Sequence, residues 1–89
     1  MPIVSQFYGI IVRIYFKDSE KHYLEHIHVQ YNEHDAVYSI KECALLEGEL
    51  PPKQHKLLVA WMEIHKEELI ALWNVAQNDG EIFKIDPLR

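Results

Sequence analysis

The chain has 89 residues, of which 48% are hydrophobic and 11% aromatic, a composition typical of globular rather than disordered proteins. This is the length of one domain, so residues 1–89 are expected to fold together around a single modest core. Acidic residues outnumber basic ones by 14 to 9, for a net charge of −5. Because proteins that coat nucleic acids neutralise phosphates with a basic surface, no broad nucleic-acid-binding surface is expected.

The sequence also predicts the cellular compartment of the protein. Cys43 is the only cysteine, so no disulfide can form within the chain, and nothing indicates an oxidising compartment. The first six residues lack the basic start and apolar run of a signal peptide. The longest apolar run, residues 57–62, is far shorter than the roughly 20 residues that cross a bilayer. We therefore expect a cytoplasmic protein that makes no contact with a membrane.

The first predicted element is a strand over residues 7–16, rich in β-branched and aromatic residues. Ile10, Val12 and Ile14 fall on one face of this strand, and Ile11 falls on the other. Since both faces are largely apolar, the strand is expected to be central and covered on both sides. The polar residues 17–25 that follow are expected to form a loop.

A β-hairpin is predicted next. Residues 26–31 alternate in polarity, residues 32–35 have turn chemistry, and residues 36–40 resume the strand pattern. Residues 43–46 are expected to add a short edge strand. The sheet should then be antiparallel.

One long helix is predicted for the C-terminal half. Pro51 and Pro52 suit a helix start, apolar residues recur at helical spacing from residue 58 to residue 76, and Gly80 suits a helix end. Such a helix of about 26 residues would be about 39 Å long. Residues 82–85 are expected to form a final strand. The predicted fold class is therefore α+β: a small antiparallel sheet of three to five strands packed on one long C-terminal α-helix, with a short final strand.

The predicted helix is apolar over more than half of its circumference. Beside the main stripe lies a second one, which comprises Leu57, Trp61, Ile64, Ala71 and Val75. A helix that covers one small sheet does not need so wide an apolar face. Two explanations remain open: an interface with a partner or a second copy of the chain, or an N-terminal segment and a C-terminal tail that wrap around the helix.

The densest chemistry in the sequence is the pair His26 and His28. Residues two apart in a strand project from the same face, about 6.6 Å apart along the backbone. Two neighbouring imidazoles could hold zinc or a similar divalent metal with a third ligand, or could act as a base and an acid near neutral pH. Two histidines spaced in this way can equally be structural or interface residues.

Other residues could complete a site around this pair. His65 falls on the main stripe of the predicted helix, where an apolar residue is expected, so the candidate metal ligands are His26, His28 and His65. Glu68 could orient His65 or accept its proton. Arg13 is a candidate anion clamp on a mainly apolar strand, and His22 could swing toward the pair. The alternatives are a core histidine bonded to a backbone carbonyl for His65 and a surface ion pair for Arg13.

Several motifs, in order along the chain, resemble those of a bacterial and archaeal family catalogued as domain-of-unknown-function family 4160. They are residues 1–5, residues 7–13, His26-Ile27-His28-Val29-x-Tyr31, residues 46–51, Trp61-x-x-x-His65-x-x-Glu68-Leu69-x-x-x-Trp73 and residues 83–85. The family usually has proline before the histidine pair and phenylalanine within it, where this chain has Glu25 and Ile27. Some relatives have a second histidine where Tyr23 stands.

The resemblance implies a stand-alone protein that is often encoded beside another small protein, an arrangement similar to toxin–antitoxin modules. Two functions follow as hypotheses. The first is a protein-binding component of such a two-gene cassette, whose partner is the neighbouring gene product or a second copy of the chain, and whose acidic charge suits a basic partner. The second is a small histidine-dependent hydrolase or ribonuclease-like toxin, with or without a metal. That enzyme would use His26, His28 and His65, with Glu68 as orienting group and Arg13 on phosphate.

Overall fold

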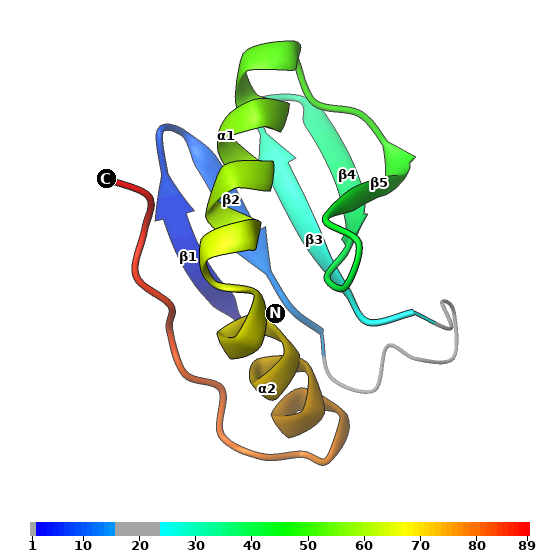
Figure 1. Ribbon diagram of the computed structural model, residues 1–89, viewed down its shortest axis with the longest axis vertical. Helices are drawn as coiled ribbons and strands as arrows, with labels where there is room; N and C mark the ends of the chain where they lie inside the picture. Colours follow the sequence, from blue (N-terminus) through cyan, green and yellow to red (C-terminus); the bar gives the residue numbers. More distant parts are fainter. Residues whose placement is uncertain (1, 16–23) are drawn as a thin grey trace.

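The computed structural model describes residues 2–15 and 24–89, and it contains one antiparallel sheet in which the strands follow one another in chain order (Figure 1). Its five strands are β1 (Ile3–Phe7), β2 (Ile10–Arg13), β3 (His26–Tyr31), β4 (His34–Ser39) and β5 (Ala44–Gly48). The α+β class is confirmed, and the strand count is five. Every neighbour in the sheet is also a neighbour in sequence, and two-residue turns join β1 to β2 and β3 to β4.

The N-terminal strand prediction was wrong in one respect. The expected single strand over residues 7–16 is interrupted by a turn at Tyr8-Gly9, so that Phe7 ends β1 and only Ile10–Arg13 form β2. Both turn residues have positive φ, 49° and 81°, as the tight turns that join twisted antiparallel strands require. Phe16, at the end of the expected strand, lies outside the described residues. One glycine inside an apolar run was therefore the sign of a turn.

The second hairpin is confirmed. β3 pairs with β4 from His26↔Ser39 to Tyr31↔His34, and Asn32, with a φ of 52°, helps to form the tight turn. The expected edge strand is present as β5. Its last residue, Gly48, has a φ of 72°, and an added Cβ would come within 2.0 Å of the Asp35 carbonyl oxygen. Glycine is therefore required where the end of β5 approaches β4.

The expected long helix is divided into α1 (Pro52–Ile64) and α2 (Lys66–Gln77). His65 separates them, with φ −109° and ψ 21°, which lie outside the α-helical region. No proline or glycine follows Pro52 within this stretch, so periodicity alone could not reveal the break. None of the helices that the structure describes has the length and apolar character needed to cross a membrane.

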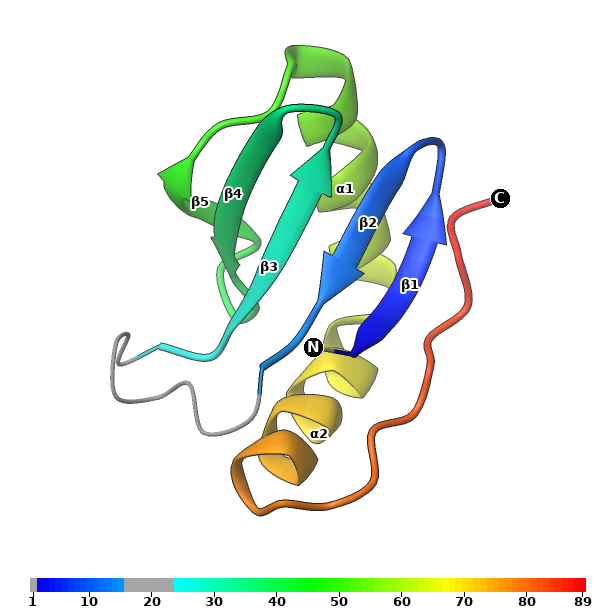
Figure 2. The ribbon, with the colours of Figure 1, turned by 180° about the vertical axis from the view of Figure 1, so that it is seen from behind.

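The helices cover one face of the sheet, and the other face is turned toward the viewer in Figure 2. The core lies between these two layers. Its largest fully buried side chains include Trp61, Tyr38, Leu58, Met62, Leu69 and Leu72. On β2, Ile10 and Val12 are fully buried, whereas Ile11 and Arg13 on the opposite side are only half-buried. Of the elements described, the helices cover one side of this strand, so coverage on both sides is not observed.

The chain after α2 forms a tail that runs back beside β1 (Figures 1 and 2). Residues 82–85, expected as a strand, are extended but are not part of the sheet. The Ile85 backbone N–H donates to the Val4 carbonyl at 2.8 Å, and the Trp61 indole N–H donates to the Asp86 carbonyl at 2.7 Å. The tail therefore covers part of the wide apolar helix face, which supports the wrapping explanation.

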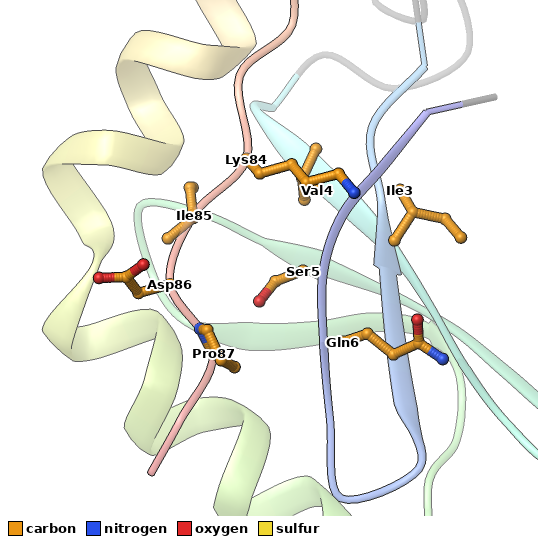
Figure 3. Close-up of a pocket in the computed structure, with 8 residues that line it drawn as sticks. All are labelled: Ile3, Val4, Ser5, Gln6, Lys84, Ile85, Asp86 and Pro87. Carbon is orange, nitrogen blue, oxygen red and sulfur yellow. The ribbon is translucent and has the colours of Figure 1, made fainter.

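A hollow of about 290 Å³ separates β1 from the tail (Figure 3). Ser5 is buried and faces the tail, and its hydroxyl makes no hydrogen bond within the described ranges 2–15 and 24–89. Pro87, which lacks a backbone N–H, lines the same hollow. The tail therefore lies beside β1 without extending the sheet as a sixth strand.

One polar contact in the core gives a pH prediction. The Tyr38 hydroxyl and His55 Nδ1 share a hydrogen bond of 2.7 Å, and burial raises the pKa of Tyr38 to about 12 from an ordinary value of 10.0. Folding therefore favours the neutral phenol. The stability that depends on this phenol should be complete below pH 10 and should be lost as the pH rises from 10 to 12.

We expect the Tyr38→Phe variant to lose this part of the alkaline decline in stability, as measured by urea unfolding at several pH values. Tyr8→Phe is the matched control, because Tyr8 is exposed in the β1–β2 turn and should leave the decline unchanged. Equal alkaline declines in the wild type and in Tyr38→Phe would contradict the assignment.

Candidate functional site

The histidine pair is brought together, but its two members occupy different environments. The ring centroids of His26 and His28 are 5.2 Å apart. His26 is fully buried, donates from Nδ1 to the Leu24 carbonyl at 2.8 Å, and lies 4.8 Å from the ring of Trp73 on α2. These contacts fix the orientation of the His26 ring and shield it from solvent. In this position His26 is a structural residue at the start of β3.

His28 lies on the open face of the sheet and is half-buried. Its ring stacks on that of Tyr15, with centroids 4.1 Å apart and an angle of 8° between the planes. Arg13 is its direct partner on β2, and the Arg13 guanidinium donates to the Gln30 side-chain oxygen at 2.9 Å. We name the four residues Arg13, Tyr15, His28 and Gln30 the open-face cluster. Sequence reasoning selected Arg13 and His28 but missed the other two, although same-face alternation along β3 indicates Gln30.

The strand register places the open-face cluster within a row that crosses the sheet. Ile3, Arg13, His28, Val37 and Glu47 are successive register partners from β1 to β5. A hollow of about 300 Å³ beside His28 is lined by Asp35, Val37 and Glu47, among others. The charge on this face is therefore divided, with the guanidinium on the β2 side and two carboxyl groups on the β4–β5 side.

The two histidines should respond differently to substitution. We expect His26→Ala to destabilise the fold by about 2–4 kcal/mol, because it removes a buried ring and leaves the Leu24 carbonyl without its partner. His28→Ala should cost about 1 kcal/mol or less, since it removes a half-buried stacking contact. Urea unfolding of both variants measures the difference. A larger loss for His28→Ala than for His26→Ala would contradict these environments.

His65 occupies a separate place at the junction of the two helices. It donates from Nδ1 to the Glu68 carboxylate at 2.6 Å, and its ring centroid lies 5.5 Å from that of Trp61. Glu68 therefore orients His65, as the spacing suggested. The His65 ring lies against Trp61, whereas the rings of His26 and His28 contact each other, Trp73 and Tyr15. His65 and Glu68 form a pair of their own.

A three-histidine metal centre is not assembled in this structure. Within residues 2–15 and 24–89, no three His, Cys, Asp or Glu side chains are grouped so that they could hold a metal ion. Zinc sites need ligand atoms about 2.0–2.3 Å from one ion. His22, a further candidate for this site, lies outside the described residues.

Two ionisable groups on the loops around the sheet have shifted pKa values. A hydrogen bond to its own backbone, assisted by Lys41 at 3.2 Å, lowers the pKa of Glu25. The Glu25 carbonyl also accepts a hydrogen bond from the Ile40 N–H, so this residue anchors the start of β3. Burial, together with the charge of Glu63, raises the pKa of the Cys43 thiol. A buried thiol that resists ionisation is a poor nucleophile, and Cys43 is structural.

The second candidate site is the outer edge of the sheet at β5. No other strand among those described pairs with the outer side of β5, and its residues from Leu45 to Gly48 are exposed. Leu45 and Leu46 are 40% and 37% exposed. An edge strand presents unpaired backbone groups to a partner strand. Sequence reasoning predicted this edge strand but did not select Leu45 and Leu46 as site residues, because the exposure of both depends on the sheet order.

The exposed edge is also acidic. Glu42, Glu47 and Glu49, on β5 or next to it, are all exposed, whereas Lys41 is paired with Glu25. The two leucines and the surrounding carboxylates define what we name the β5 edge: Glu42, Leu45, Leu46, Glu47 and Glu49. The combination suits an extended segment that carries apolar and basic side chains.

The fold and these sites define a small α+β protein with one helix-covered sheet face, one open face and one exposed edge. A family model described as "Domain of unknown function (DUF4160)" matches residues 9–74. The chain belongs to this family, as the resemblance of its motifs predicted. No curated protein and no solved structure matches the chain.

Proposed function

We propose that this protein is a protein-binding component of a two-gene, toxin–antitoxin-like cassette, and that it docks its partner through the β5 edge. The observation that carries the proposal is the exposure of Leu45 and Leu46 on the outermost strand of the sheet. A partner strand added there would gain main-chain hydrogen bonds from the edge and apolar contact from the two leucines. The occupant we propose is an extended basic and apolar segment of the small protein encoded next to this one.

Charge favours a different protein over a second copy of the chain. Two β5 edges placed against each other would bring Glu42, Glu47 and Glu49 of each copy together, and like charges across a strand pair are destabilising. The whole chain also carries a net charge of −5. A basic partner would be attracted both by the carboxylates of the β5 edge and by the net negative charge of the chain. Electrostatic steering would also accelerate its association. The buried, unpaired Cys43 is compatible with a complex formed in the cytoplasm.

The helix face supports docking less well than the β5 edge. Trp61 is fully buried and bonded to the tail, and Ile82 and Leu88 pack against the core. Ile64 is 66% exposed, but it is the one large hydrophobic side chain on α1 and α2 that is exposed. We therefore assign docking to β5 and keep Ile64 as the control surface.

The geometry does not favour the hydrolase alternative. A general acid or base must come within hydrogen-bond reach of the group from which it moves a proton. The His26 ring is fully buried and donates to a backbone carbonyl, and His65 is bonded to Glu68 at the helix junction. These contacts do not present the histidines to one substrate.

The test is to express the chain with and without its neighbouring gene product and to measure complex formation by size-exclusion chromatography with light scattering. A 1:1 or other fixed-ratio complex whose affinity falls as salt rises is the expected result, because exposed opposite charges are screened by salt. A chain that stays unbound beside its neighbour, or that forms only a homodimer through β5, would overturn the proposal.

A further inference from the structure

The open-face cluster has a feature that the proposed docking function does not use. Arg13 carries a positive charge on a half-buried strand position, and its guanidinium donates to the neutral amide of Gln30. Acidic residues outnumber basic ones in the chain, yet Arg13 makes no ion pair with any carboxylate in the described ranges. A guanidinium has five N–H donors in a planar fork, so most of its donors remain for another acceptor.

The neighbours of Arg13 extend this set of donors. Gln30 turns its side-chain oxygen to the guanidinium, so its amide nitrogen carries the remaining donors of that side chain. His28 lies directly across the strand pair from Arg13, with its ring held in place by Tyr15. Guanidinium, amide and imidazole groups together form a surface that matches the oxygens of a carboxylate or a phosphate.

The surroundings limit how such a ligand can lie. Toward β4 and β5, Asp35 and Glu47 would repel an anion. Two half-buried apolar residues are neighbours of Arg13: Ile3, its register partner on β1, and Ile11, which lies two residues before it on the same face of β2. An oxyanion seated on Arg13 would therefore extend its remaining atoms over the two isoleucines.

We propose that the open-face cluster is a binding site for an oxyanion, a phosphate monoester or a carboxylate, whose apolar body rests on Ile3 and Ile11. The site is independent of the proposed docking function, since Arg13 lies on β2 and is separated from β5 by two strands. Arg13 binds the oxyanion, Gln30 and His28 assist it, and Tyr15 positions His28.

The experiment uses the fact that the chain contains two arginines, Arg13 and Arg89. The Nε–H resonances of both are followed by NMR while phenyl phosphate, benzoate or phenol is added at constant ionic strength. We expect a saturable shift of the Arg13 signal with phenyl phosphate or with benzoate, and no shift with phenol, which lacks a full charge. The signal of Arg89, in the exposed tail, should stay in place. The anion that saturates the Arg13 shift at the lower concentration identifies the preferred oxyanion, a phosphate monoester or a carboxylate.

Variants make the test specific. Because these variants lack the Arg13 Nε–H, the backbone amide signals of His28 and Gln30 are followed in the wild type and in both variants. Arg13→Gln should remove the saturable response of these signals, and Arg13→Lys, which keeps the charge but loses the fork, should weaken binding about tenfold or more. The backbone spectrum of each variant shows whether the fold is retained, and Arg13→Lys serves if Arg13→Gln does not fold. Parallel shifts of Arg13 and Arg89, or a linear response to both anions, would mean general ion screening and would overturn the proposal. Binding of the neighbouring protein is measured separately, so either proposal can fail alone.

Discussion

A chain carrying Leu45→Lys and Leu46→Lys is expected to lose its partner. The two substitutions remove the exposed apolar side chains of β5 and place positive charges on the edge, which blocks both strand addition and attraction of a basic segment. Interface anchors of this kind contribute about 2 kcal/mol or more each, so the affinity should fall on the order of a hundredfold to a thousandfold. Isothermal titration calorimetry with the purified neighbouring gene product measures the change.

The matched control is Ile64→Lys, which replaces another exposed apolar side chain with the same charge but on the helix layer. It should bind the partner as the wild type does. Loss of binding in Ile64→Lys with retention in the double variant would place the interface on the helices instead. Both variants should unfold at similar urea concentrations to the wild type, because they replace exposed side chains.

Trp61→Ala should destabilise the fold more than His26→Ala or His28→Ala. Trp61 is fully buried, its ring lies 5.1 Å from that of Phe7, and its indole N–H donates to the tail. Removing a buried tryptophan typically costs about 3–5 kcal/mol, a large part of the roughly 5–15 kcal/mol that stabilises a small domain. The midpoint of thermal unfolding should fall by roughly 15 °C or more. Trp73 remains as the fluorescent reporter.

Trp61→Phe separates packing from the hydrogen bond. Phenylalanine keeps an aromatic ring but cannot donate to the Asp86 carbonyl, so the expected cost is about 1–2 kcal/mol. The tail of this variant should also become more susceptible to proteolysis after residue 80, because the hydrogen bond from Trp61 to the tail is lost. The tail is then held by the hydrogen bond from Ile85 to Val4. Equal losses of stability in Trp61→Phe and Trp61→Ala would show that the hydrogen bond, and not the ring, holds the tail.

Local chemistry was sufficient to predict several parts of this protein. The alternation of residues 26–31 and the turn chemistry after them predicted the second hairpin, and Pro52 correctly predicted where the helical region begins. Same-face spacing predicted that the rings of His26 and His28 meet, and helical spacing predicted the contact between His65 and Glu68. Each of these depends on residues close in sequence, so backbone periodicity determines them.

The arrangement of the predicted elements depends on contacts between distant parts of the chain. Residues 7–16 were expected to form one strand because they are rich in β-branched and aromatic residues. The turn at Tyr8-Gly9 is defined by the pairing of β1 with β2. The break at His65 has no breaking residue beside it, so it could not be predicted from helical periodicity. His26 became structural because α2 places Trp73, from a distant part of the sequence, against its ring.

The wide apolar helix face illustrates the same difference. The sequence predicted correctly that this helix face is covered, either by a partner or by another part of the chain, since apolar surface favours burial. Whether a partner or the chain itself covers it depends on where the tail runs, and two backbone-directed hydrogen bonds fix that tail beside β1 and α1. For this reason we propose docking at the β5 edge, which is exposed because β5 is the last strand of the sheet. Strand order is a property of the whole fold, and no local pattern contains it.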